Sequence, residues 1–276
     1  MRITKYMNKL LENLLNEYDT IVVGAGSGLS AAAGFEYGGK TFMDNFKYMY
    51  DLYGYTNMYE ASFHDFSTQE EKWGFFSKMI YLNRYQGKGN KLYKRLFELI
   101  KTKDYFIITT NVDHQFQLAG VDKARLFYTQ GDYGLFQCQT PCHNKTYDNE
   151  KIVKEMLKNL NNHKIPTSLI PRCPICGKPM TMNLRCDDTF VEDEGWHKAK
   201  QRYINFINKV KNKKVLYLEL GVGNSTPGWI KYPFMNLTNE NKNAMYVVVN
   251  EEKQFIPKVI EKKTIVINDN INNVLM

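Results

Sequence analysis

Polar and glycine residues that could contact a ligand follow two apolar stretches of the chain. Asn111 and Asp113 come directly after the run 104–110, and the glycine-rich stretch 24–28 follows the run 19–23. Apolar runs without alternation are typical of parallel strands that are buried on both faces. In an open α/β sheet, polar residues just beyond the carboxyl ends of the strands face the ligand crevice. Such positions also suit helix N-caps, so both roles stay open for Asn111 and Asp113.

The glycine-rich stretch predicts a phosphate-binding turn between a strand and a helix. Gly24, Gly26 and Gly28 are expected to leave backbone N–H groups accessible to a diphosphate, next to the positive end of a helix. Leu29 stands where an ordinary dinucleotide fingerprint has its third glycine. No second strand ends in an acidic residue about 20 positions on, since Asp44 lies among aromatic residues. The pattern favours a nucleotide site over a plain glycine-rich turn, and a dehydrogenase is the weaker interpretation.

Four cysteines form two pairs at spacings that suit tetrahedral coordination of zinc. They are Cys138, Cys142, Cys173 and Cys176. His143 is an alternative for one ligand, and Cys186 is expected to be an ordinary thiol. Four thiolates leave zinc no open position, so the metal is expected to be structural. We expect the polar stretch between the two pairs to be helical, with little core of its own.

The composition is that of a folded chain with one sizeable core and a smaller lobe, since it has 276 residues. Its net charge of +8 invites nucleic acid, but the lysines are scattered among asparagines, which is more typical of a solvated surface. No apolar run reaches the length of a membrane span, and residues 1–17 show helical spacing of leucines instead of a signal peptide. We therefore predict a cytoplasmic protein that binds neither nucleic acid nor membranes.

Further apolar runs predict a doubly wound parallel sheet with its ligand along one edge. The expected strands cover 19–23, 104–110, 126–128, 214–220, 244–249 and 264–267. Thr68-x-x-Glu71 is a capping box that predicts a helix through Tyr85. Pro227 suits the first turn of another helix.

Taken in chain order, these motifs resemble a sirtuin across nearly the whole chain. They are the glycine loop, the Thr-Asn-Val-Asp strand end, the turn at Gly131, the cysteine pairs, a Gly-x-Gly-Asn-Ser turn and a strand that ends in Asn250. The resemblance implies a Rossmann-like domain that binds and cleaves NAD, with release of nicotinamide. It implies an NAD-binding domain over 1–135 and 196–276, with a helical insert at about 36–86, and a small zinc-binding module over 136–195.

The resemblance also implies which residues bind NAD. Ala25, Gly26 and Ser30 are expected near the diphosphate, and Asn111 and Asp113 at the nicotinamide ribose. The full expected set is Gly24, Ala25, Gly26, Ser30, Phe35, Thr110, Asn111, Asp113, Gln130, Gly221, Gly223, Asn224, Ser225, Asn250 and Glu251.

Two departures from the sirtuin pattern indicate a particular branch of the family. The usual Pro-Asp-Phe-Arg stretch is replaced by residues 35–39, and the usual histidine before Gly131 is replaced by Gln130. Both departures resemble the class M sirtuins, which are associated with macrodomain proteins and lipoyl-carrier proteins. This resemblance implies an ADP-ribosyltransferase.

The chemistry of glutamine agrees with that implication. Deacylation by a sirtuin needs a base for a ribose hydroxyl, and the Gln130 side chain has no nitrogen that titrates near neutral pH. A carboxylate acceptor is already ionised at pH 7 and needs no base. We therefore predict transfer of ADP-ribose to an acidic side chain of a protein, with Asn111, Asp113 and Gln130 as catalytic residues. The alternatives are a deacylase with His114 as its base, a non-catalytic NAD sensor and a plain NAD hydrolase.

Overall fold

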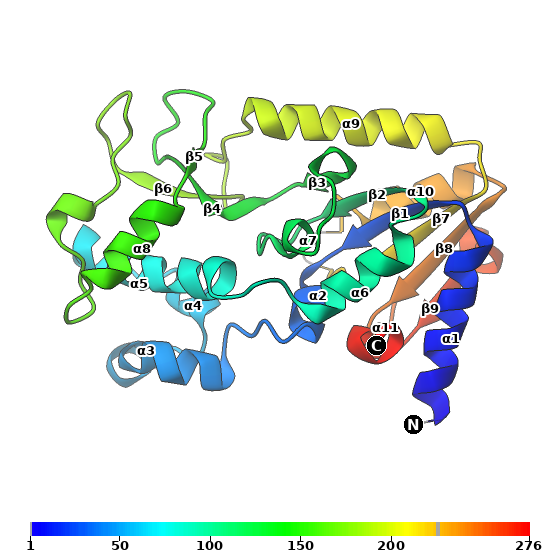
Figure 1. Cartoon of the computed structure of the whole chain (residues 1–276), viewed down its shortest axis with the longest axis horizontal. Helices are drawn as coiled ribbons and strands as arrows, with labels where there is room; N and C mark the ends of the chain where they lie inside the picture. The colour runs from blue at the N-terminus through cyan, green and yellow to red at the C-terminus, as the bar shows by residue number, and fades with distance from the viewer. Residues whose placement is uncertain (1, 225–226) are drawn as a thin grey trace. The chain divides into compact units, whose positions relative to one another are not determined.

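The chain forms two compact units in the structure, a computed structural model that describes residues 2–224 and 227–276, with only the backbone described for 2–7. The parallel-sheet unit comprises residues up to 34, 89–130 and 194–276. The cysteine unit comprises residues 35–88 and 131–193, and therefore groups the expected helical insert with the cysteine pairs. Figure 1 shows the elements of both units along the chain.

A six-stranded sheet in the order β3-β2-β1-β7-β8-β9 forms the centre of the parallel-sheet unit. Its strands are β1 (Thr20–Ala25), β2 (Asp104–Thr109), β3 (Leu126–Tyr128), β7 (Val215–Leu220), β8 (Ala244–Val249) and β9 (Thr264–Ile267). All neighbouring strands run parallel, and every residue of β1 and β7 is buried. With the six strands numbered in chain order, the arrangement is 3-2-1-4-5-6, the order of a dinucleotide-binding sheet. The expected doubly wound fold is confirmed.

The register of this sheet brings the strand ends to one level. Ala25 pairs with Thr109 on one side and with Leu220 on the other. Leu220 in turn pairs with Val249, and Thr109 pairs with Tyr128. Since the strands are parallel, the residues that follow β1, β2, β3, β7 and β8 all leave the sheet at the same edge. The order of the strands reverses between β1 and β7, which is where an open sheet of this kind binds its ligand.

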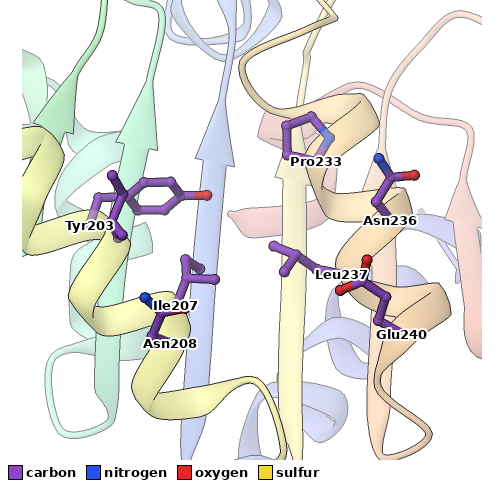
Figure 2. A pocket seen from close by; sticks show the side chains of 8 residues that line it. Tyr203, Ile207, Asn208, Pro233, Asn236, Leu237 and Glu240 are labelled. Carbon is purple, nitrogen blue, oxygen red and sulfur yellow. The ribbon is translucent and has the colours of Figure 1, made fainter.

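Helices surround the parallel sheet in two groups. One group, in mutual contact, consists of α1 (Arg2–Glu17), α2 (Ser27–Ala32), α6 (Lys91–Ile100) and α11 (Ile271–Leu275). The other consists of α9 (Glu194–Val210), which packs against β2 and β3, and α10 (Lys231–Glu240), which packs against β7 and β8; the two border a hollow of about 370 Å³ (Figure 2). Short helices complete the unit: α7 (Gln115–Leu118), η2 (Lys123–Arg125) and η4 (Lys258–Lys263).

One helix start differs from the expectation. Pro227 lies in a turn ahead of α10, and its carbonyl accepts the N–H of Tyr232, so the helix begins four residues later than the proline indicated. None of the helices in the described part of the chain is long and apolar enough to cross a membrane.

The cysteine unit contains a second sheet that the sequence did not predict. Its strands β4 (Gly131–Cys138), β5 (Tyr147–Asp148) and β6 (Met180–Leu184) pair in the order β5-β4-β6 and are antiparallel. The helices of the unit are α3 (Gly39–Tyr53), α4 (Met58–Ala61), α5 (Gln69–Ile80), η1 (Tyr81–Tyr85), α8 (Glu150–Lys158) and η3 (Thr167–Leu169).

The expected helix between the cysteine pairs is confirmed as α8, and its buried residues Val153 and Met156 belong to a helix that packs against α5. Strand β4, just before the first pair, adds the buried Phe136, whose ring lies 4.8 Å from that of Trp73 on α5. Strand β4 escaped prediction because polar residues interrupt its apolar pattern. The buried side chain of Gln137 is one of them. Its Oε1 accepts a hydrogen bond from Asn183 at 2.7 Å, and its Nε2 donates to the carbonyl of Thr189 at 2.7 Å. These partners offset the cost of burying the amide.

The N-cap half of the capping box at the start of α5 is confirmed. The hydroxyl of Thr68 accepts the N–H of Glu71 at 3.2 Å. The expected helix continues to Tyr85, although its last five residues form a π-helical turn.

Candidate active site

The two glycine turns at the centre of the sheet edge pack directly against each other. A Cβ on Gly26 would lie 2.7 Å from the carbonyl oxygen of Gly221, and a Cβ on Gly28 would lie 2.7 Å from the Cα of Gly221. Gly221 itself has a φ of +61°, which favours glycine. The turns after β1 and β7 therefore need glycine for close approach of their backbones.

This packing changes the expected role of the glycine N–H groups. Gly26 donates its N–H to the carbonyl of Leu220 at 3.0 Å, and Gly28 donates to Gly221 at 2.9 Å. Both donors hold the two turns together, so they are not open to a diphosphate as the sequence suggested. Gly24 lies inside β1, where a Cβ would clash with Ile230, so it serves the packing of the sheet.

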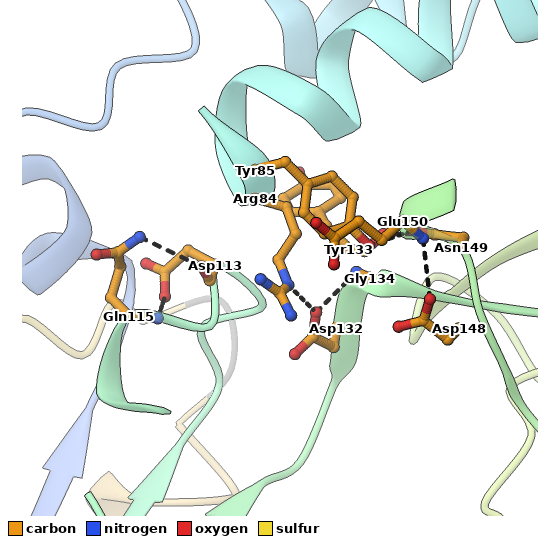
Figure 3. Close-up of polar contacts among 10 residues, drawn as sticks. All are labelled: Arg84, Tyr85, Asp113, Gln115, Asp132, Tyr133, Gly134, Asp148, Asn149 and Glu150. Carbon is orange, nitrogen blue, oxygen red and sulfur yellow. Dashed lines mark hydrogen bonds and ion pairs between the residues drawn. The ribbon is translucent and has the colours of Figure 1, made fainter. Parts of the chain in front are cut away.

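At the end of β2, a buried polar cluster surrounds Asp113. Its carboxylate oxygen Oδ2 accepts hydrogen bonds from the hydroxyls of Ser30 at 2.6 Å and Tyr93 at 3.0 Å. Its Oδ1 accepts the N–H of Gln115 at 3.0 Å, a contact drawn in Figure 3. The capping alternative is therefore correct in part, since Asp113 satisfies a backbone donor at the start of α7. Ser30, expected near the diphosphate, donates its hydroxyl hydrogen to Asp113.

Asn111 belongs to the same cluster. Its Nδ2 donates to the Tyr93 hydroxyl at 3.1 Å, and its backbone N–H donates to the Thr109 side chain at 3.0 Å. Only 9% of Asn111 and 7% of Asp113 is exposed, so both side chains are nearly enclosed. The cluster thus joins residues of α2, α6 and the end of β2. Thr110 is buried beside it and donates its N–H to Ala25 at 3.1 Å.

Gln130 follows β3 at the position that matches Asn111 on β2. The ladder between these strands continues past the register pairs, because Thr129 donates its N–H to Thr109 at 2.9 Å. Trp196 holds the carbonyl of Thr129 with its indole N–H at 3.1 Å. Gln130 is half-buried, and within the described ranges its side chain makes no hydrogen bond to another residue. Its amide is therefore available to a ligand at the edge of the sheet.

The residues expected at the adenosine half lie beyond β7 and β8. Asn250 is buried, donates to the carbonyl of Val222 at 3.2 Å and accepts the N–H of Glu252 at 3.1 Å, so it ties the two strand ends together. Gly223 is half-buried and Asn224 exposed. Glu251 is also exposed and accepts from Asn270 at 2.8 Å. Ser225 lies outside the described residues.

A hollow of about 430 Å³ adjoins this half of the edge. It is lined by Asn224, Lys231, Gln254 and the apolar Phe255, among others. Phe35, the remaining residue of the expected set, is half-buried and opens the cysteine unit.

The four cysteines gather as the sequence predicted. The Sγ atoms of Cys138 and Cys176 are 3.6 Å apart, those of Cys142 and Cys173 are 3.7 Å apart, and all four lie within 4.8 Å of one another. Tetrahedral zinc with Zn–S bonds of about 2.3 Å has sulfur–sulfur edges of about 3.8 Å. The cluster therefore fits a structural zinc ion. His143 lies beside Cys142 but outside this set of four.

An ion pair in the cysteine unit was missed from the sequence. Arg84 donates from Nε to Asp132 Oδ1 at 2.9 Å, and the two side chains are 14% and 6% exposed (Figure 3). Asp132 also accepts the N–H of Gly134 at 2.7 Å, and the guanidinium lies over the ring of Tyr85 at 4.9 Å. Arg84 gave no local signal because it lies in the π-helical turn, 48 residues from its partner.

The chain is similar to curated proteins over most of its length. It is 38% identical over 268 residues to a protein ADP-ribosyltransferase of Staphylococcus aureus, a match that covers 97% of this chain and 85% of that protein. It is 30% identical over 254 residues to a probable bifunctional ADP-ribose hydrolase/ADP-ribosyltransferase of Fusarium oxysporum f. sp. cubense, a match that covers 87% of this chain and 41% of that protein. No family model matches the chain.

A solved structure of Sir2 with a p53 peptide and NAD⁺ shares the fold. The two agree with a TM-score of 0.55 over 96% of this chain and 94% of that chain, at 20% identity. The fold of this chain is thus that of a sirtuin. The 38% identity identifies the family within that fold. The chain belongs to the sirtuin-type protein ADP-ribosyltransferases, a family of NAD-dependent enzymes.

Proposed function

We propose that this enzyme transfers ADP-ribose from NAD to an acidic side chain of a protein acceptor. The observation that supports this proposal is Gln130, whose uncommitted amide stands at the end of β3, level with Asn111. A glutamine can donate and accept hydrogen bonds, but it cannot take up a proton near neutral pH. An acceptor that needs no base fits such a site.

The reaction balances without any proton transfer. The bond between the anomeric carbon and the nicotinamide nitrogen breaks, and its electron pair leaves with nicotinamide, which becomes neutral. One oxygen of the acceptor carboxylate then forms a bond to the anomeric carbon and loses its negative charge. The acceptor is already ionised at pH 7, because carboxyl groups titrate near about pH 4.

We propose separate roles for the three polar residues. Asn111 hydrogen-bonds the nicotinamide ribose through its carbonyl oxygen, and Gln130 hydrogen-bonds the ribose hydroxyls and guides the acceptor. The negative charge of Asp113 stabilises positive charge that develops on the ribose as the bond breaks. The three hydrogen bonds that Asp113 accepts within the cluster keep its carboxylate in place for this role.

The proposed NAD site lies at the edge of the sheet where the parallel strands end. We propose that the diphosphate lies beside Ala25 and Gly26 without using the N–H of Gly26, which Leu220 already accepts. The adenosine half is proposed to lie along Gly221, Gly223, Asn224, Ser225, Asn250 and Glu251. In this proposal residues 1–135 and 196–276 bind NAD, while 136–195 hold zinc.

We propose a lipoyl-carrier protein as the acceptor and a macrodomain protein as the partner that reverses the modification. The resemblance to class M sirtuins supports both choices. The Fusarium oxysporum relative supports the second, since its name joins an ADP-ribose hydrolase to an ADP-ribosyltransferase in one chain. We place the reaction in the cytoplasm, where free and metal-bound thiols are common.

Intact-protein mass spectrometry tests this function. A lipoyl-carrier protein is incubated with the enzyme and NAD, and acetyl- and lipoyl-lysine peptides are run in parallel. We expect one added ADP-ribose mass on the carrier with wild-type enzyme and with Asn208→Ala, a matched change at an exposed position of α9. We expect no added mass with Asn111→Ala. Loss of acyl groups from the peptides, with an unmodified carrier, would instead support the deacylase.

A further inference from the structure

Tyr93 is the buried centre of the polar cluster at the end of β2. It lies on α6, its side chain is 0% exposed, and its ring packs against Phe116 with centroids 4.9 Å apart. Its hydroxyl lies within 3.1 Å of three polar atoms, from Ser30, Asn111 and Asp113. A tyrosine on the apolar face of a helix normally serves packing. The hydrogen bonds of its hydroxyl indicate that Tyr93 also orders the polar groups around it.

The direction of each hydrogen bond follows from counting hydrogens. Nδ2 of Asn111 can only donate, so the Tyr93 oxygen accepts from it. The single hydroxyl hydrogen of Tyr93 is then given to the Asp113 carboxylate, which can only accept when it is ionised. Ser30 donates its own hydrogen to the same carboxylate oxygen. The network is therefore satisfied with one orientation of the Asn111 amide.

That orientation determines what Asn111 offers to a ligand. With Nδ2 turned to Tyr93, the carbonyl oxygen Oδ1 is on the opposite side of the amide. It has no hydrogen bond to any residue that the structure describes. Oδ1 is an acceptor suited to a ribose hydroxyl or a water molecule. The reversed amide would turn Nδ2 outward and present a donor instead.

The donor of Tyr93 persists over the working pH range. Burial and the negative charge of Asp113 hold the pKa of Tyr93 well above its ordinary value. The hydroxyl of Tyr93 therefore keeps its proton near neutral pH.

We propose that Tyr93 is a positioning residue for the transfer reaction, which holds the Asn111 amide so that its carbonyl oxygen faces the nicotinamide ribose. Tyr93 itself does not touch NAD and acts through Asn111 and Asp113. This inference rests on the proposed function, because it concerns the geometry of the same site. It separates Tyr93 from residues that bind the diphosphate or the adenosine.

Tyr93→Phe tests the proposal, because it removes only the hydroxyl and keeps the ring against Phe116. We expect kcat for nicotinamide release and for transfer to fall about 10²-fold, the typical cost of misplacing a catalytic group by about 1 Å. We expect KM for NAD and the melting temperature to stay close to those of the wild type. The matched control is Tyr217→Phe, since Tyr217 is also buried in the parallel-sheet unit but its hydroxyl has no hydrogen-bond partner among the described residues.

A double variant separates positioning from general weakening of the fold. Tyr93→Phe in an Asn111→Ala background is expected to cause no further loss of kcat, because residues that act as a unit are not additive. Ser30→Ala provides a second probe if Tyr93→Phe does not fold, with a smaller loss of kcat expected from one missing donor to Asp113.

An active wild type with an equally active Tyr93→Phe variant would overturn this inference alone. Additive losses in the double variant would overturn it as well. A wild type that neither releases nicotinamide nor modifies a carrier would overturn the proposed function together with this inference.

Discussion

Replacing Lys231 by methionine is expected to destabilise the parallel-sheet unit strongly, because it leaves a buried carboxylate without its cation. Lys231 Nζ lies 2.7 Å from Glu219 Oε1, and the side chains are 6% and 0% exposed. Tyr246 donates to the other carboxylate oxygen, and Gln254 accepts from Lys231 at 2.5 Å. Removing one partner of a buried pair typically costs about 3–5 kcal/mol. At about 2–4 °C per kcal/mol, Tm should fall by about 6–20 °C.

The loss of stability in Lys231→Met should increase with pH. Burial raises the pKa of Glu219, and Lys231 opposes that rise. A carboxyl group with a raised pKa binds protons more readily in the folded state, so the free energy of unfolding falls as pH rises from its ordinary pKa through its folded pKa. Without Lys231 the pKa of Glu219 in the folded protein rises further. The pH range over which stability falls then becomes wider. The deficit of Lys231→Met should therefore be largest at pH 7 and smaller at pH 5.

Urea unfolding followed by tryptophan fluorescence measures this effect. A Trp73→Phe background leaves Trp196 and Trp229, both in the parallel-sheet unit, as the reporters. The control is Glu219→Gln combined with Lys231→Met, which removes both charges and should recover most of the lost stability. The reasoning would be refuted by a loss below about 1 kcal/mol, the range of exposed ion pairs. A deficit that is equal at pH 5 and pH 7 would refute it as well.

Three further outcomes are expected. Metal analysis should find one zinc per chain, which Cys142→Ser loses and Cys186→Ser keeps; full zinc in Cys142→Ser would contradict the four-cysteine site. Gly28→Ala should lower stability by about 1–3 kcal/mol, as overpacking does, because its Cβ would lie 2.7 Å from Gly221. Gly228→Ala is the control, since its Cβ meets nothing within 4 Å, and equal melting temperatures for the two variants would count against the packing. Finally, kcat of transfer should be flat from about pH 6 to 8, since a carboxylate acceptor needs no base, whereas a bell-shaped profile near about pH 7 would indicate one.

The parallel strands could be predicted closely. The expected strand 126–128 coincides with β3, and 244–249 and 264–267 coincide with β8 and β9. Buried parallel strands consist of continuous apolar residues, so each is visible within a few positions of the chain. The polar residues at their ends could be found for the same reason.

The antiparallel sheet of the cysteine unit could not be predicted in this way. Strand β4 begins with Gly131 and Asp132 and ends with Gln137 and Cys138, so it lacks both a continuous and an alternating apolar pattern. Its buried polar groups are satisfied by partners far along the chain, such as Arg84 and Asn183. The residue pattern of one stretch contains no information about partners that lie far away in the sequence.

The candidate site shows the same division. Asn111, Asp113 and Gln130 were found because they follow strands, but their hydrogen-bond partners were not. Ser30 is 83 residues from Asp113, and Tyr93 is 20 residues from it. The prediction that the N–H groups of the glycine loop are open was wrong for the same reason. Two of them donate to the carbonyls of Leu220 and Gly221, at the end of β7.

The sequence by itself determined the parallel strands, the polar residues at their ends and the four cysteines of the candidate zinc site, because each depends on local spacing. Only the tertiary structure decided which groups meet. It paired Gly28 with Gly221, joined Tyr93 to Asn111, and left the carbonyl oxygen of Asn111 without a hydrogen bond among the described residues. The physical reason is that contacts between distant segments depend on how the strands and helices pack, and packing leaves no periodic mark on either segment alone.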